Sequence, residues 1–156
     1  MGKIVTQSEI IKIVRKGQSE GKTFVVTNGC FDILHVGHAK YLNQTKQVAD
    51  YSIVLLNSDK SVRELKGEGR PINNESDRAE LLTFLSCVDY VVLFEERSPA
   101  ELLDKIKPDY YTKGADYTID TLPEREVILR NNIKVKFIDL VEGKSTTNII
   151  GKINAK

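Results

Sequence analysis

Short apolar runs alternate along this chain with segments that carry helix signals, and this alternation constrains the fold more than any other feature. The apolar runs are Phe24–Thr27, Tyr51–Leu56, Tyr90–Phe94, Asp109–Lys113 and Val135–Ile138. Strands that alternate with helices pair in parallel, because each helix returns the chain to the same end of the sheet. The sequence therefore predicts an α/β fold with a doubly wound sheet of about five parallel strands and flanking helices.

Capping residues mark the predicted helix starts. Thr6–Glu9 forms a capping box that begins a helix ending near Gly17. Ser98–Glu101 combines an N-cap serine, a proline at the first helical position and the reciprocal glutamate, and Thr121–Glu124 repeats the pattern. The remaining helices are predicted from His35 to about Val48, over Ser61–Leu65, over Asn74–Ser86 and after Thr147.

Length and charge narrow the class of protein. The 156 residues suit one domain, 1–156, without repeats or linkers. With 23 basic and 22 acidic residues, no long-range field favours nucleic acid or an anionic membrane. The N-terminus lacks the apolar core of a signal peptide, and no run approaches the roughly 20 apolar residues of a membrane span. We therefore expect a cytoplasmic protein in which Cys30 and Cys87 are free thiols.

Polar and glycine-bearing segments follow the predicted strands. Asn57 and Asp59 follow the second strand, and Lys113, Gly114 and Asp116 end or follow the fourth. In a Rossmann-like sheet, ligands bind beyond the carboxyl ends of the strands. These segments should therefore converge on a single site.

The turn Asn28–His38 lies between the first strand and its helix. Both histidines of the chain, His35 and His38, stand three residues apart at this helix start, where free N–H groups and the helix dipole attract anions. Gly29 and Gly37 should let a ligand approach the backbone. We interpret the turn as a phosphate site. The alternatives are a structural role for the histidines, or a zinc site that adds Cys30 but lacks a further Cys or His cluster to complete it.

Other phosphate ligands are needed because neither G-x-G-x-x-G nor G-x-x-x-x-G-K-[ST] follows the first strand. Lys66 and Arg70 flank a polar loop that should cover the site, unless they are simply solvated. Ser145, Thr146 and Thr147 begin the last helix, where hydroxyl and N–H groups could face a triphosphate. Ordinary N-capping is the alternative for Ser145 and Thr146.

The motif Gly29-Cys30-Phe31-Asp32 followed by His35-Val36-Gly37-His38 resembles the G-x-F-D-x-x-H-x-G-H motif of the cytidylyltransferase-like nucleotidyltransferases. Nearly the whole chain is also similar to the adenylyltransferase domain of bacterial ADP-heptose synthases. That wider similarity includes Asn57–Asp59, Leu65–Gly67, Arg70–Asn73, Arg78, Phe94–Glu96 through Asp109, Lys113–Tyr117 and Ser145–Ile150.

This resemblance implies transfer of AMP from ATP to a sugar 1-phosphate, D-glycero-β-D-manno-heptose 1-phosphate, with release of pyrophosphate. It implies catalytic roles for His35, His38 and Lys66. Implied nucleotide-binding residues are Asn28, Gly29, Cys30, Phe31, Gly37, Arg78, Lys113, Gly114, Ser145, Thr146 and Thr147. Implied substrate-binding residues are Asp32, Asn57, Asp59, Arg70 and Asp116.

The resemblance also implies a cofactor and partners. Mg²⁺ would be held chiefly by the ATP phosphates rather than by a protein metal site. Asp32 would either assist the ion or cap the turn Asn28–His38, which we call the motif turn. A separate sugar kinase would supply the substrate, and the chain would form a homodimer. Neither nucleic acid nor a membrane is expected as a partner.

Two alternatives stay open. One is another nucleotidyltransferase of this fold, such as a glycerol-3-phosphate cytidylyltransferase, since base choice would depend on backbone groups near Gly114. Those enzymes carry Arg-Thr-Glu-Gly before the serine, whereas this chain has Leu140–Lys144 there, with Lys144 as a substitute cation. The other alternative is a nucleotide-binding regulatory module that has lost catalysis.

Overall fold

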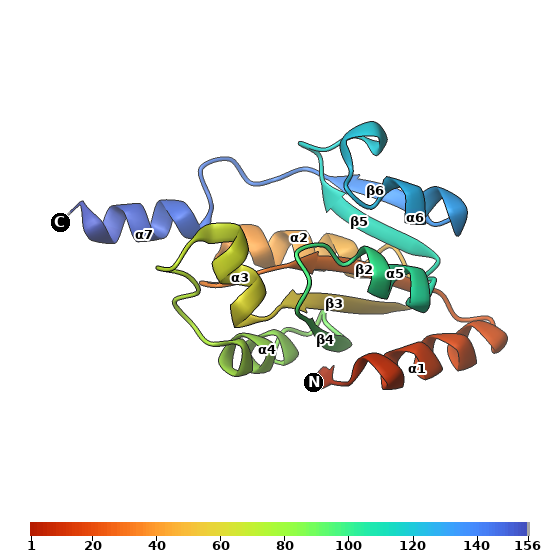
Figure 1. Ribbon diagram of the computed structural model, residues 1–156. Coiled ribbons are helices and arrows are strands. Elements are labelled where there is room, and N and C mark those ends of the chain that lie inside the picture. The colour runs from red at the N-terminus through yellow and green to blue at the C-terminus, as the bar shows by residue number, and fades with distance from the viewer. Residues whose placement is uncertain (156) are drawn as a thin grey trace.

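A computed structural model describes residues 1–155 and shows one parallel sheet with helices on both faces (Figure 1). The strands are β1 (Lys3–Ile4), β2 (Phe24–Gly29), β3 (Tyr51–Asn57), β4 (Tyr90–Phe94), β5 (Tyr110–Gly114) and β6 (Lys134–Ile138). The helices are α1 (Gln7–Ser19), α2 (Val36–Lys46), α3 (Asp59–Lys66), α4 (Glu75–Thr83), α5 (Ala100–Ile106), the 3-10 helix η1 (Ile119–Thr121), α6 (Arg125–Arg130) and α7 (Thr146–Asn154).

The strand order β1-β4-β3-β2-β5-β6 places the reversal of the winding direction between β2 and β5. The chain runs outward from β2 through β3 to β4, and then crosses to β5 and β6 on the other side. Every strand pair is parallel, which confirms the predicted fold class. The predicted number of five strands is wrong by one, because β1 pairs with β4 through Lys3 and Ile4 alone. Two residues are too short to give an apolar run.

Two apolar cores lie on opposite faces of the sheet. The first packs α1, α5 and α6 against side chains such as Ile53 and Leu55 of β3. The second packs α2 and α4 against Val54 and Leu56 of the same strand. Successive side chains of a strand point to opposite faces, so a strand covered on both sides must be apolar throughout. This explains the uninterrupted apolar run of β3.

The helix starts confirm one capping prediction and correct two. Thr6 and Glu9 form the expected box at α1. At α5 the N-cap position is Pro99 rather than Ser98. The Ser98 hydroxyl accepts the N–H of Ala100 at 3.3 Å and donates to the carboxylate of Glu124 at 3.3 Å. The Thr121–Glu124 box is also wrong: Thr121 accepts the N–H of Thr118 within η1, and α6 begins at Arg125 without a side-chain cap.

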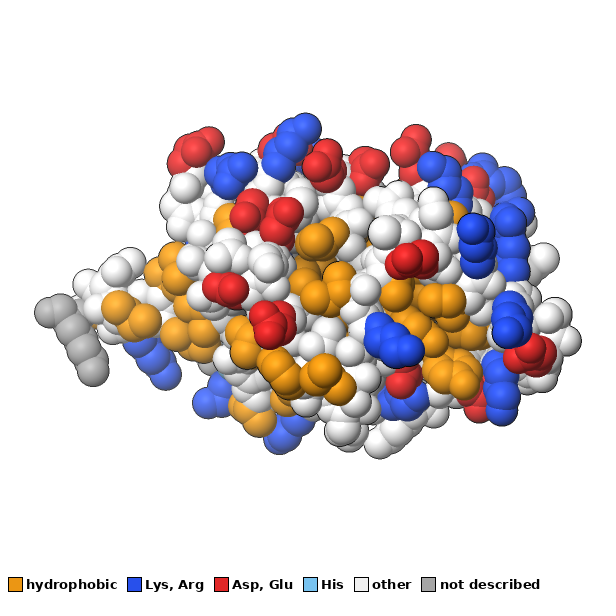
Figure 2. Space-filling model, turned by 90° about the horizontal axis from the view of Figure 1, so that it is seen from below, with side chains coloured by type: hydrophobic (Ala, Val, Ile, Leu, Met, Phe, Trp, Pro, Cys, Tyr) orange, Lys and Arg blue, Asp and Glu red, His pale blue; other side chains and the backbone are white. Residues whose placement is uncertain are grey.

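Helix α7 projects from one end of the molecule (Figure 1). Figure 2 shows apolar side chains on the same projection. Ile153 of α7 is among the exposed apolar residues. Acidic and basic side chains are interspersed over the face seen in Figure 2, as the near-neutral charge leads one to expect. Over residues 1–155, no helix combines the length and the apolar character that crossing a bilayer requires.

Candidate active site

A cleft of about 740 Å³ opens at the carboxyl ends of β2 and β5, where the winding direction reverses. The structure brings together at this cleft all of the predicted site residues except Arg78 and Asp59. They are Asn28, Gly29, Cys30, Phe31, Asp32, His35, Gly37, His38, Asn57, Lys66, Arg70, Lys113, Gly114, Asp116, Ser145, Thr146 and Thr147.

The two histidines stack on each other at the N-terminus of α2. Their ring centroids are 3.8 Å apart and the ring planes meet at 23°. His35 is the N-cap, and its Nδ1 accepts the N–H of Gly37 at 3.1 Å. Because Nδ1 is an acceptor here, the proton of the neutral ring belongs on Nε2. His35 therefore has an N–H donor left for a ligand.

Burial keeps both histidines uncharged at neutral pH. It lowers the pKa of His35, with Lys144 adding a smaller effect in the same direction. Burial, with a smaller effect of His35, lowers the pKa of His38 to about 4. The Nδ1 atom of His38 is buried and has no hydrogen-bond partner within residues 1–155. An anion in the cleft would thus meet two neutral N–H donors rather than two cations.

The glycines of the motif make room for side chains. A Cβ atom on Gly37 would lie 2.8 Å from the His35 ring, and one on Gly29 would lie 2.8 Å from the Phe31 ring. Phe31 itself has a φ of 46°, in the left-handed region. Besides any approach of a ligand, these glycines therefore allow the side chains of Phe31 and His35 to fold back over the turn.

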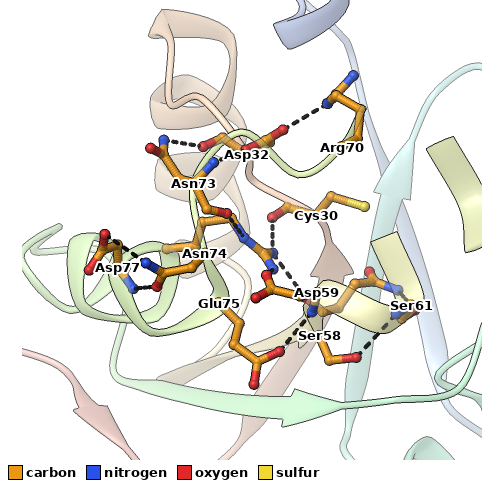
Figure 3. A network of polar contacts seen from close by, with 12 residues as sticks. Cys30, Asp32, Ser58, Asp59, Ser61, Arg70, Asn73, Asn74, Glu75 and Asp77 are labelled. Atoms are coloured by element: carbon orange, nitrogen blue, oxygen red, sulfur yellow. Dashed lines mark hydrogen bonds and ion pairs between the residues drawn. The ribbon is translucent and has the colours of Figure 1, made fainter. Parts of the chain in front are cut away.

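Asp32 clamps the loop that follows α3 (Figure 3). Its buried carboxylate accepts Nε of Arg70 at 2.7 Å and the backbone N–H groups of Ile72 and Asn73 at 2.9 Å. Burial alone would raise the Asp32 pKa, but these donors together hold it below its usual range. Both carboxylate oxygens are engaged, so the geometry favours a structural role for Asp32 over assistance to a metal ion.

The two predicted site residues outside the cleft lining, Arg78 and Asp59, pair with each other. The fully buried Arg78 side chain donates to the carbonyl oxygens of Asn73, Cys30 and Asn57 at 2.7–2.9 Å. Its Nη2 also pairs with Asp59 at 2.9 Å. Arg78 thus ties the ends of β2 and β3 to the loop beneath the cleft, and few of its N–H groups remain for a triphosphate.

The N-terminus of α7 lines the cleft beside the motif turn. The Ser145 hydroxyl accepts the N–H of Asn148 at 3.0 Å, so the capping role considered for Ser145 is confirmed. The Thr146 hydroxyl donates to the carbonyl oxygen of Ile33 at 3.0 Å. This bond joins α7 to the motif turn. Lys144, beside His35, completes this end of the cleft.

A second end of the cleft contains side chains that the sequence did not single out as site residues. Arg97 and Ser98 follow β4, and the carboxyl-end rule could have found them, but Ser98 was interpreted as a helix cap. Glu124 lies there through tertiary packing, for which the sequence has no local signal. Lys113, whose pKa is lowered by burial, donates to Asn28 at 3.2 Å across the β2–β5 boundary.

The described residues contain no group of three His, Cys, Asp or Glu side chains arranged to hold a metal ion. Cys30 is a free thiol whose pKa is raised by burial. A zinc site built from Cys30, His35 and His38 therefore has no support in the geometry.

The cleft, with N–H donors at one helix N-terminus and hydroxyl groups at another, defines an α/β protein that binds phosphate groups of a nucleotide. The Cytidylyltransferase-like family matches residues 26–152, and the chain belongs to this family. It is a nucleotidyltransferase.

Comparison with curated proteins agrees. The chain is 50% identical over 151 residues to the bifunctional protein HldE of Campylobacter fetus subsp. fetus (strain 82-40), and 46% identical to that of Syntrophotalea carbinolica. Each alignment covers 97% of this chain and 31% of the relative, so the chain spans about a third of the length of these relatives.

A solved structure shares the fold. The lipopolysaccharide core biosynthesis protein of Thermoplasma volcanium GSS1 is 31% identical, with a TM-score of 0.63. The match covers 80% of this chain and all of that one.

Proposed function

We propose that this chain transfers AMP from ATP to a sugar 1-phosphate, D-glycero-β-D-manno-heptose 1-phosphate, and releases pyrophosphate. Similarity to the HldE proteins over 97% of the chain supports the choice of substrates. The observation that carries the reaction type is the pair of stacked, neutral histidines at the N-terminus of α2, which line the same cleft as the N-terminus of α7. A kinase that supplies the sugar 1-phosphate, and a homodimer, remain part of the proposal.

The chemistry requires positioning and charge stabilisation. A phosphate oxygen of the acceptor attacks the α-phosphorus of ATP in line, a new P–O bond forms, and the bond to the bridging oxygen of the β-phosphate breaks. The attacking oxygen is already ionised at neutral pH, so no general base is needed. The N–H groups of His35 and His38 and the ammonium of Lys66 stabilise the charge that develops on the phosphates.

Mg²⁺ carried by the ATP phosphates would neutralise part of their charge. The carboxylate of Asp32 is engaged by Arg70 and two backbone N–H groups, which fits an ion held by the nucleotide rather than by the protein. The loop clamped by Asp32 would keep Arg70 beside the acceptor phosphate while Lys66 spans both substrates.

The test measures pyrophosphate release with Mg²⁺, offering ATP or CTP with heptose 1-phosphate, other sugar 1-phosphates or glycerol 3-phosphate. We expect release with ATP and the heptose 1-phosphate. The variant His38→Ala should lose about 10²- to 10³-fold in turnover, because the N–H donor of the imidazole to the leaving phosphates is lost.

Other outcomes would contradict the proposal in distinct ways. Release with CTP and glycerol 3-phosphate would keep the reaction type but replace both substrates. Tight ATP binding without release across the panel would favour a regulatory module. Full turnover by His38→Ala would remove His38 from catalysis.

A further inference from the structure

Glu124 has a buried carboxylate on the wall of the cleft and no function in the mechanism above. The residue is 2% exposed, and its Oε1 accepts the hydroxyl of Ser98 at 3.3 Å. Its Oε2 has no hydrogen-bond partner within the part of the chain that the structure describes. A buried carboxylate oxygen without a donor is unfavourable by several kcal/mol in order of magnitude, and such groups commonly mark a binding site.

The surroundings of Glu124 carry both donors and acceptors. Its charge is among the causes that act to raise the pKa of Lys113 and of Tyr111, so the carboxylate lies near both. The Lys113 ammonium and the Tyr111 hydroxyl meet at Oδ1 of Asn28, at 3.2 Å and 2.5 Å. We call Asn28, Ser98, Lys113 and Glu124 the polar corner of the cleft.

The rest of the cleft suits the other parts of the two substrates. The phosphate ligands gather at the N-termini of α2 and α7. Beside them, a Cβ atom on Gly114 would lie 2.6 Å from Oδ1 of Asp116 and 3.1 Å from the side chain of Leu140, so Gly114 leaves a narrow space beside a carboxylate and an apolar side chain. The polar corner belongs instead to the segments that follow β4 and β5, together with Asn28 at the end of β2.

We propose that Glu124 is a specificity-determining residue that accepts hydrogen bonds from hydroxyl groups of the sugar acceptor. A carboxylate offers two acceptor oxygens and no donor, which matches a pair of neighbouring hydroxyls, while Lys113 donates to the oxygens of the same groups. The inference rests on the proposed function, since it concerns the acceptor of that reaction. It explains how the site would reject acceptors that carry a phosphate but lack a polyol.

The test compares Glu124→Gln with Glu126→Gln as a matched control. Glu126 is an exposed residue of α6 outside the cleft lining, so its variant should behave as wild type. Glu124→Gln keeps the shape but replaces one acceptor oxygen by a donor. We expect the KM for the sugar 1-phosphate to rise on the order of 10- to 100-fold, as for loss of a hydrogen bond to a charged group. The calorimetric Kd for ATP should not change.

A second measurement uses deoxy acceptors that lack single hydroxyls. Wild type should lose catalytic efficiency with the deoxy sugar whose missing hydroxyl bonds to Glu124, whereas Glu124→Gln should not distinguish it from the parent sugar. Glu124→Asp should restore part of this discrimination. Melting temperatures of all variants guard against misfolding, and the deoxy series on wild type stays informative even where a variant unfolds.

The results that would contradict the inference differ from those that would contradict the proposed function. Unchanged discrimination by folded Glu124→Gln would overturn the role of Glu124 and leave the proposed function intact. A weakened ATP Kd with an unchanged acceptor KM would move Glu124 to the nucleotide and also overturn the inference. Absence of turnover by wild type with any sugar phosphate, while ATP binds, would overturn the proposed function and the inference together.

Discussion

His38 shows how a single side chain can be tuned by burial. The stacked ring of His35 on one side and the Phe31 ring, 5.1 Å away, remove water that would otherwise stabilise the imidazolium. A neutral ring donates one N–H without needing a counter-ion when the cleft is empty. Binding of a polyphosphate should then raise the pKa of His38 above its value in the empty cleft.

The low pKa of His38 predicts that the folded state loses stability as the pH falls. The unfolded state takes up a proton on His38 near pH 6.5, whereas the folded state does so near pH 4. Between these values the unfolded state binds more protons, so the free energy of unfolding should fall as the pH falls. The contribution of this group is at most about 1.4 kcal/mol per pH unit.

Urea titrations of wild type and His38→Gln at several pH values would measure this effect. The stability of wild type relative to the variant should decline from pH 6.5 to pH 4 and be constant above pH 7. An NMR titration of the His38 ring gives the folded pKa directly. A midpoint near 6.5 would contradict the prediction.

A second prediction concerns Arg78, a charged residue that we expect to stabilise the folded state. Replacing it by Met leaves three backbone carbonyls and Asp59 without their donor beneath the cleft. We expect the free energy of unfolding to fall by about 3–5 kcal/mol in denaturant titrations. Arg63→Met, on the exposed side of α3, should change it by less than about 0.5 kcal/mol. Unchanged stability with weakened ATP binding would return Arg78 to the phosphates.

The sequence predicted most members of the site but not all of their roles. The motif and the carboxyl-end rule identified His35, His38 and Lys113 because these signals depend on local spacing. The sequence did not show that Arg78 bonds to backbone carbonyls, because an arginine can bind either phosphate groups or carbonyl oxygens. Glu124 was missed because only the packing of the segments after β4 and β5 brings it to the cleft.

At the scale of elements, the strands were predicted more closely than the helix starts. Predicted strand bounds agree to within one or two residues, since doubly covered strands require apolar runs. The capping pattern at Thr121 misled because its hydroxyl accepts the N–H of Thr118, whereas the Ser98 hydroxyl accepts the N–H of Ala100 and also bonds to Glu124. Capping residues compete for such partners, and tertiary structure decides between them.

Helix α7 depends on few contacts for its position. Thr146 is the buried residue of this helix, and its hydroxyl bonds to Ile33. Thr146→Val should speed amide exchange in α7 about fivefold, the effect of losing a bond worth about 1 kcal/mol, while exchange in the sheet stays unchanged. The exposed Thr147→Val is the control. Equal exchange in wild type and Thr146→Val would show that other contacts hold the helix.

At the scale of the whole molecule, both cores share the central strands. Leu103 belongs to the core of α1, α5 and α6, and Leu82 to the core of α2 and α4. Each substitution by Ala should lower the free energy of unfolding by about 2–5 kcal/mol. Because β3 contributes to both cores, we expect a single transition in each variant.

Circular dichroism and tyrosine fluorescence, followed together during urea unfolding, test this cooperativity. Leu129→Ala, at a half-exposed position of α6, should leave the midpoint nearly unchanged. Separate transitions seen by the two probes would show that the faces of the sheet unfold independently.

The joining of α7 to the motif turn has a consequence for the order of events during synthesis. The turn is made first, and the hydroxyl that bonds to Ile33 follows more than a hundred residues later. All six strands have left the ribosome before the N-terminus of α7 reaches the cleft. A nucleotide can therefore contact both helix N-termini only once α7 has docked on the motif turn.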